Sequence, residues 1–150
     1  MAVEEILISG QAWLAIVCSM VAAILLGFLW YAPFSPTGKI WMKGMNQSAD
    51  FKPDPKKMAV AYGLMIVGTF LTMYVLVHVM LAFVDAPMAD KDLMFSDAAV
   101  GSIFVWLGFF VPQAFAQVSW EGKSWSFMFV NVGYSLVNLQ IVGAIMAALV

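Results

Sequence analysis

The chain has 150 residues, of which 63% are hydrophobic and only 11% are charged. That composition describes one compact unit whose solvent is mostly lipid, with no separate soluble domain. A formal net charge of −2 offers no basic surface, so we expect no nucleic-acid partner. Cys18 is the only cysteine, which excludes an internal disulfide and a multi-cysteine metal site, and we predict neither a metal nor a cofactor.

Charged side chains are confined to the connections between four long uncharged stretches. No Asp, Glu, Lys or Arg lies between Glu5 and Lys39, and comparable stretches follow Lys57, Asp97 and Lys123. About 20 helical residues cross the hydrocarbon of a bilayer, where the backbone must satisfy its own hydrogen bonds. The sequence therefore predicts an all-α polytopic membrane protein, a four-helix bundle forming one domain over residues 1–150, with spans at about 7–31, 58–83, 98–119 and 125–149.

The first two loops carry opposite charges. The second loop is acidic and holds Asp85, Asp90, Asp92 and Asp97 beside one lysine, whereas the first is rich in lysine and holds Lys39, Lys43, Lys52, Lys56 and Lys57. Positively charged residues resist translocation across the membrane, so the first loop is predicted to stay in the cytoplasm. Both termini are then expected outside, and Lys123 in the short third loop agrees with this orientation.

The predicted cytoplasmic interface is rich in aromatic residues. Trp30 and Tyr31 end the first span, and tryptophans also border the third loop. Indole rings prefer the headgroup region, where an apolar ring and a polar N–H both find partners. The segment from Gly38 to Met45 mixes lysine with apolar residues, as an in-plane interfacial turn does. The candidate interface residues are Lys39, Trp41, Glu121, Lys123 and Trp125.

The charges of the third loop have two interpretations. Glu121 and Lys123 either bind a lipid headgroup or pair with each other and with Lys39. Exposed ion pairs contribute little to stability, so neither interpretation implies a large energetic role.

A faint internal repeat links the two halves of the chain. Leu26-Gly27-Phe28 precedes Gly38-Lys39-Ile40-Trp41, and Leu107-Gly108-Phe109 precedes Gly122-Lys123-Ser124-Trp125. Each unit would contain two spans, so the units would be helical hairpins related by an axis along the membrane normal. Such short motifs also recur by chance, and the sequence leaves both explanations open.

Helical spacing divides the third span into two faces. One face carries the small or kinking residues Gly101, Gly108 and Pro112, and we expect it to be a packing seam because small residues allow backbones to approach in lipid. The other face carries Gln113 and Gln117. Pro112 cannot donate a hydrogen bond to the carbonyl of Gly108, so we also expect an irregular turn there, as a static kink or as a hinge.

The fourth span is the most polar, with Asn131, Tyr134 and Asn138 on one face. Lipid cannot satisfy an amide, so this face must meet protein or water. It either forms interhelical hydrogen bonds or lines a solvated cleft; the candidate residues are Gln113, Gln117, Asn131, Tyr134, Asn138, Trp30 and Tyr31. The opposite face, with Gly133 and Ala144, is expected to pack against the chain's other hairpin or a second subunit.

The segments GFLWYAPF, GKIWMKGM, VWLGFFVP, WEGKSW and NVGYSLVNLQIVGAI occur in this order. In this respect the chain resembles a bacterial family of small four-span membrane proteins classed only as a domain of unknown function. The resemblance extends from about Gly27 to the C-terminus and implies a bacterial plasma-membrane protein of four spans, with no activity to carry over. The chain departs from the expected glycine at Pro36-Thr37.

Two classes of function remain. An enzyme is disfavoured because the spans hold only His78, tyrosines and one thiol as titratable groups, and a proton-coupled carrier is disfavoured because no carboxylate lies within them. The chain is expected to be a non-enzymatic membrane module that contacts lipid, as a homo-oligomer or with another membrane protein. The alternative is a passive or facilitative transporter or channel for a small neutral molecule, which the polar face would bind.

Overall fold

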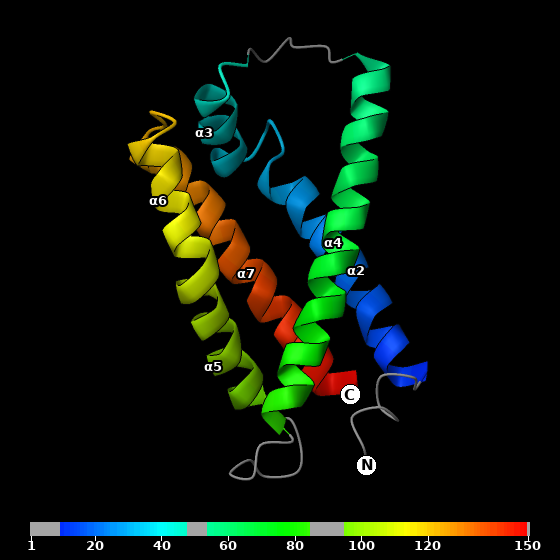
Figure 1. Ribbon diagram of the computed structural model, residues 1–150. Helices are drawn as coiled ribbons and strands as arrows, with labels where there is room; N and C mark the ends of the chain where they lie inside the picture. The colour runs from blue at the N-terminus through cyan, green and yellow to red at the C-terminus, as the bar shows by residue number, and fades with distance from the viewer. Residues whose placement is uncertain (1–9, 48–53, 85–94, 150) are drawn as a thin grey trace.

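The computed structural model describes residues 10–47, 54–84 and 95–149, and these residues are helical apart from short turns (Figure 1). The elements are α2 (Gly10–Trp30), α3 (Pro36–Gly44), α4 (Pro55–Val84), α5 (Phe95–Val105), the π-helical turn η1 (Trp106–Phe110), α6 (Val111–Ser119) and α7 (Trp125–Leu149). Four helical segments are long and apolar enough to span a membrane, with α5, η1 and α6 together forming the third. The predicted four-span bundle is confirmed.

α7 is the central helix of the bundle. It packs against α2, α5, α6 and α3, whereas α4 packs mainly on α2. The buried core lies where α2, α4 and α7 meet, and it includes Ile16, Ala23, Met73, Leu76, Val77, Leu139, Val142 and Met146. The buried face of α2 consists largely of small residues, namely Ala12, Ala15, Ser19 and Ala23. Such residues let two helix backbones approach closely, which is the main source of packing energy in lipid.

Hydrogen bonds to backbone carbonyls tie α5 and η1 to α7. The Ser102 hydroxyl donates to the carbonyl of Leu139 at 3.1 Å, and the indole N–H of Trp106 donates to that of Val132 at 2.9 Å. Gln140 returns a bond from α7 to the carbonyl of Ala99 at 3.1 Å. In hydrocarbon an unpaired polar group has no solvent partner, so these polar side chains turn toward a neighbouring helix.

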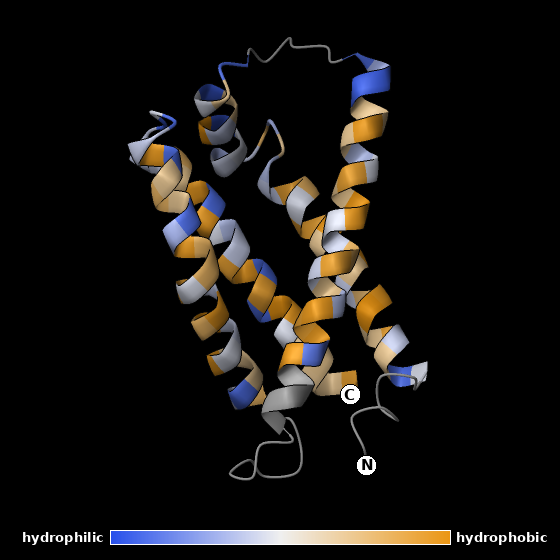
Figure 2. Cartoon of the chain, in the orientation of Figure 1, coloured by the Kyte–Doolittle hydropathy of each residue, from blue (hydrophilic) through white to orange (hydrophobic). Residues whose placement is uncertain are grey.

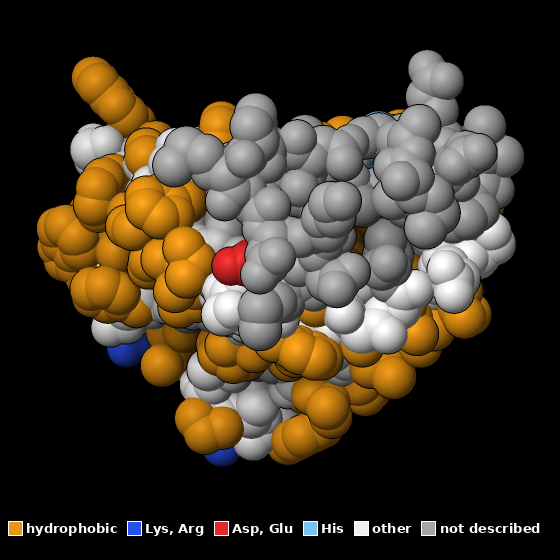
Figure 3. All heavy atoms as spheres, turned by 90° about the horizontal axis from the view of Figure 1, so that it is seen from below, with side chains coloured by type: hydrophobic (Ala, Val, Ile, Leu, Met, Phe, Trp, Pro, Cys, Tyr) orange, Lys and Arg blue, Asp and Glu red, His pale blue; other side chains and the backbone are white. Residues whose placement is uncertain are grey.

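The two ends of the bundle differ in character. α3, the start of α4 and the turn between α6 and α7 lie at one end, and α2 begins and α7 ends at the other (Figure 1). We call the first the lysine end, because it carries Lys39, Lys43, Lys56, Lys57 and Lys123. Apolar residues dominate the middle of the long helices (Figure 2), and hydrophobic side chains cover much of the described surface in the end-on view (Figure 3).

The predicted interfacial turn of the first loop is the short helix α3. Ser35 is its N-cap and accepts a hydrogen bond from the N–H of Gly38 at 2.8 Å, while Pro36 occupies the first turn. Proline suits this position because its missing N–H would have no helical partner there. The Pro36-Thr37 segment, where the chain departs from the glycine expected in the family, therefore begins a helix. Gly38 is buried against the preceding turn, where a Cβ would lie 2.0 Å from the carbonyl oxygen of Ala32.

The irregularity expected at Pro112 is the π-helical turn η1. The N–H of Val111 bonds to the carbonyl of Trp106, five residues earlier, and α6 continues from Val111. A π turn inserts one extra residue, so the inward face after it shifts along the sequence. Ala114 is buried and Gln113 is exposed, the reverse of what a regular helix would present.

The predicted seam of Gly101, Gly108 and Pro112 is wrong within this chain. Gly108 and Pro112 are exposed, and a Cβ built on Gly101 or Gly108 meets nothing within 4 Å. The opposite face, with Ser102 and Trp106, turns toward α7 instead. Its polar groups need partners in lipid, and that requirement outweighs the close approach that small residues permit.

The two copies of the sequence repeat take different structures. Gly38 lies inside helix α3, whereas Gly122 lies in a turn with φ +65°. Gly27 is close to the Tyr134 hydroxyl, whereas Gly108 lies in the π turn with open space beside it. The likeness in sequence is therefore not matched by a likeness in local structure.

The N-terminal half of α4 stands apart from the bundle. Every residue from 59 to 68 is exposed, whereas Met73, Leu76 and Val77 further along the helix are buried. Figure 1 shows this part of α4 diverging from α2 toward the lysine end.

Candidate functional site

The candidate site is a polar network between α2, α6 and α7 in the half of the bundle nearer the lysine end. The hydroxyl of Tyr31, just after α2, donates to Oδ1 of Asn131 on α7 at 3.1 Å. The amide nitrogen of Asn131 donates in turn to Oε1 of Gln117 on α6 at 3.1 Å. We call Tyr31, Asn131 and Gln117 the amide bridge, because one asparagine joins three segments of the fold.

Aromatic rings surround the amide bridge. The Tyr31 ring lies 5.4 Å from that of Trp41 on α3 and 5.1 Å from that of Tyr134 on α7, between ring centroids. Trp30 adds a further contact to Tyr134 at 6.3 Å, and its indole N–H donates to the carbonyl of Val130 at 3.1 Å. Tilted and edge-on ring pairs at these distances are favourable, so the rings add to the packing around the amide bridge.

Tyr134 is held by α2 through a glycine. Its hydroxyl donates to the carbonyl of Ala23 at 3.2 Å, and a Cβ on Gly27 would lie 3.1 Å from the same oxygen. The absence of a side chain at Gly27 therefore makes room for the tyrosine. Helical spacing placed Tyr134 on a polar face of the fourth span, without indicating that it meets Gly27.

The structure brings together most of the predicted polar cluster. Trp30, Tyr31, Gln117, Asn131 and Tyr134 lie in the network described above. Gln113 does not, since the extra residue of η1 turns it outward. Trp41, predicted only as an interface residue, joins the cluster because α3 folds back over the end of α2.

Beyond the network, toward the middle of the membrane, two buried oxygens are without a hydrogen-bond partner among the described residues. They are Oδ1 of Asn138, one helical turn past Tyr134, and Oγ of Ser19 on α2. Ser19 is fully buried. A buried acceptor or hydroxyl left unpaired has an energetic cost, so this part of the α2–α7 interface is polar without being satisfied by the protein alone.

A second set of contacts fastens the turn before α7 to α3. The Lys123 ammonium donates to the carbonyl of Gly44 at 2.9 Å and lies 5.4 Å from the centroid of the Phe127 ring. A Cβ on Gly44 would approach that ring to 2.2 Å. Lys123 therefore binds the C-terminal end of a helix, where a cation is favourable.

The predicted ion pairing of the third loop is not formed: Lys123 uses its ammonium on Gly44, and Glu121 and Lys39 are exposed without an ion pair to a described residue. Trp125 is 58% exposed, as expected of a side chain at a membrane surface.

The opposite face of α7 is largely occupied by the chain itself. A Cβ on Gly133 would touch the Trp30 ring at 3.5 Å, and Gln140 bonds to α5. Ala147 packs partly against the core, and Ala144 is exposed. Of the two expected neighbours for this face, the chain's own helices therefore take most of it.

Residues 14–147 match the model of a family described as a protein of unknown function, DUF1761. No curated protein and no solved structure matches the chain.

Proposed function

We propose that this chain, which belongs to the DUF1761 family of unknown function, is a non-enzymatic membrane module. One observation carries the proposal: the polar side chains of the candidate site bond to one another and to backbone carbonyls. Tyr31, Asn131 and Gln117 form a continuous set of hydrogen bonds, and Tyr134 bonds to the carbonyl of Ala23. A permeation pathway needs polar groups that are free to bind a solute, whereas these groups join three segments of the fold to one another.

Solvent access to α7 tests the proposal. Single cysteines replace Ser135 and Asn138, on the polar face, in a Cys18→Ser background, and each is treated with a water-soluble thiol reagent in proteoliposomes. Ser126→Cys is the matched control, because Ser126 is on the same helix and is exposed at the lysine end. We expect Ser135→Cys, which is nearly isosteric and buried, and Asn138→Cys to react far more slowly than the control.

A second function has a specific observation in its favour. The unpaired oxygens of Ser19 and Asn138 are places where water or a small neutral solute would gain a hydrogen bond. A facilitative transporter or channel would use them as a step beyond the amide bridge. Labelling of Ser135→Cys and Asn138→Cys as fast as the control would favour this function and reject the module.

The module is proposed to act through contacts with lipid and with partner helices, either from a second copy in a homo-oligomer or from another membrane protein. Support comes from the N-terminal half of α4, where residues 59–68 are exposed on all sides. The test for a homo-oligomer is the mass of the protein in nanodiscs over a range of concentrations. A mass above that of one chain is expected, and a monomer throughout would reject self-association.

We propose further that the lysine end faces the cytoplasm of a bacterial plasma membrane, with both termini outside. The lysines of α3, α4 and the α6–α7 turn support this orientation, because positive residues resist translocation. A periplasmic reporter fused to either terminus is expected to be active, and a cytoplasmic reporter at the same site is expected to be silent. The reverse result would contradict the orientation.

A further inference from the structure

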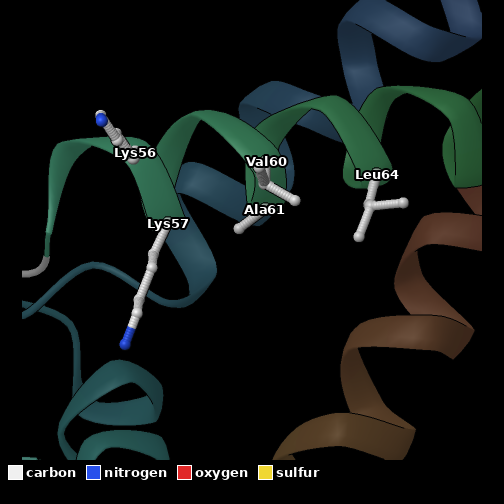
Figure 4. Close-up of a pocket in the computed structure, with 5 residues that line it drawn as sticks. All are labelled: Lys56, Lys57, Val60, Ala61 and Leu64. Atoms are coloured by element: carbon white, nitrogen blue, oxygen red, sulfur yellow. The ribbon is translucent and has the colours of Figure 1, made fainter.

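The N-terminal half of α4 borders an open hollow of about 380 Å³, lined by the α4 residues Lys56, Lys57, Val60, Ala61 and Leu64 (Figure 4). Val60 and Leu64 are 63% and 68% exposed. These apolar side chains belong to a segment hydrophobic enough to span a membrane, so contact with hydrocarbon is more favourable for them than contact with water. A lipid chain fits the lining.

The hollow is amphipathic along its length. Lys57, Ala61 and Leu64 share one face of α4 because they stand at i, i+4 and i+7. In Figure 4 the Lys57 side chain extends toward α3, and the Lys56 side chain, which also lines the hollow, points to the other side of the helix. From Lys57 to Leu64 the helix rises about 10 Å, the distance from a headgroup to the upper part of an acyl chain.

The charge around the hollow favours an anion. The described charged side chains of α3 and the start of α4 are Lys39, Lys43, Lys56 and Lys57, against the single carboxylate of Asp54. That carboxylate accepts a hydrogen bond from the backbone N–H of Lys56 at 2.9 Å and so caps α4. No ion pair to a described residue occupies the Lys57 ammonium, which is exposed. Lysines next to a membrane surface attract anionic headgroups.

We propose that one anionic phospholipid of the surrounding bilayer binds in this hollow. Its phosphate lies at Lys57, and one acyl chain runs along Val60, Ala61 and Leu64 on the surface of α4. This proposal rests on the proposed function, a module that contacts lipid, and it names the lipid and the place where it binds. A transport pathway through α7 would not need a lipid held at α4.

Native mass spectrometry of the full chain, released from nanodiscs that contain phosphatidylglycerol and phosphatidylcholine with the same acyl chains, tests the proposal. Wild type is expected to retain one phosphatidylglycerol in preference to phosphatidylcholine. Lys57→Gln should reduce that preference about fivefold, the effect of one lysine near a membrane surface. Lys57→Arg should preserve it. Lys39→Gln is the matched control, since it removes the same charge from an exposed lysine at the same end that does not line the hollow.

A second variant tests the apolar part. Ala61→Trp fills the hollow at an exposed position, so it should displace the bound lipid and leave the helix content by circular dichroism unchanged. The proposal is overturned by equal losses in Lys39→Gln and Lys57→Gln, by equal retention of the two lipids, or by a second protein chain in place of the lipid. The cysteine labelling of α7 is independent of these outcomes, so failure of the lipid site and failure of the module are distinguishable.

Discussion

Replacing Gly38 by alanine should unfasten α3 from the end of α2. A Cβ at this position would lie 2.0 Å from the carbonyl oxygen of Ala32 and 2.8 Å from Oγ of Ser35. The first contact is with backbone and falls about 1 Å short of the 3.0 Å that real Cβ atoms respect, so the turn or the helix must move. Movement would also stretch the cap that Ser35 makes on the N–H of Gly38. Overpacking of this kind costs about 1–3 kcal/mol.

The opposing term is the helix propensity of alanine, which exceeds that of glycine by about 1 kcal/mol within a helix. The same exchange at Gly68 meets nothing within 4 Å, so Gly68→Ala isolates that gain and is the matched control. Gly133→Ala, with its nearest contact at 3.5 Å, should behave like the control. Gly27→Ala should fall between, because the Tyr134 hydroxyl at 3.1 Å must shift slightly.

The assay is reversible unfolding in mixed micelles by titration with sodium dodecyl sulfate, followed by circular dichroism. We expect Gly38→Ala to unfold at a lower detergent fraction than wild type, with a loss of stability of up to about 2 kcal/mol, and Gly68→Ala to unfold at a higher fraction. The two variants should therefore differ by about 1–3 kcal/mol. If Gly38→Ala is as stable as Gly68→Ala, α3 does not seat against Ala32, and the docking of Trp41 on Tyr31 loses its support.

Two further predictions use the same assay. Tyr31→Phe removes the hydroxyl that bonds to Asn131 and should destabilise the protein by about 0.6 kcal/mol, the average for such bonds in membrane proteins. A double-mutant cycle with Gln117→Leu should show coupling between the two positions. Strictly additive effects would mean that Asn131 does not bridge Tyr31 and Gln117. Ser19→Ala removes a buried hydroxyl that has no hydrogen-bond partner in the described part of the chain, and it should be neutral or stabilising by about 1 kcal/mol. A loss of stability would indicate that a water molecule bonds to Ser19.

The parts of the fold that depend on lipid as a solvent were predictable from sequence. Charge-free stretches located the four spans, because each charge in hydrocarbon has a cost that no local propensity offsets. The polar face of α7 was also visible, since Asn131 and Tyr134 need partners wherever the helix packs. What those partners are depends on tertiary contacts, and the meeting of Tyr31 with Asn131 has no signature in either segment alone.

The side predicted for Gln113 was wrong because the third span is not a uniform helix. The faces of the third span were drawn with a uniform helical period, and η1 breaks that period at Trp106. Gln113 is therefore assigned to the wrong side, and Ala114 takes its place in the packing. Pro112 predicts that a disturbance exists but not whether it bends the helix or inserts a residue. The exposure of the N-terminal half of α4 could not be predicted from the sequence either, because a face that contacts lipid and a face that contacts protein are both apolar.

The central position of α7 governs how the protein is made. The other three spans precede α7 along the chain, and α7 is the helix against which both α2 and α5 pack most extensively. During synthesis those helices enter the bilayer before the surface on which they assemble exists. Three groups of the third span, the Ser102 hydroxyl, the Trp106 indole and the Gln117 amide, find their hydrogen-bond partners on α7. Until α7 has been synthesised, these groups need temporary partners. Insertion and assembly are thus separate events in this molecule, and the interval between them is when a quality-control protease would find it most vulnerable.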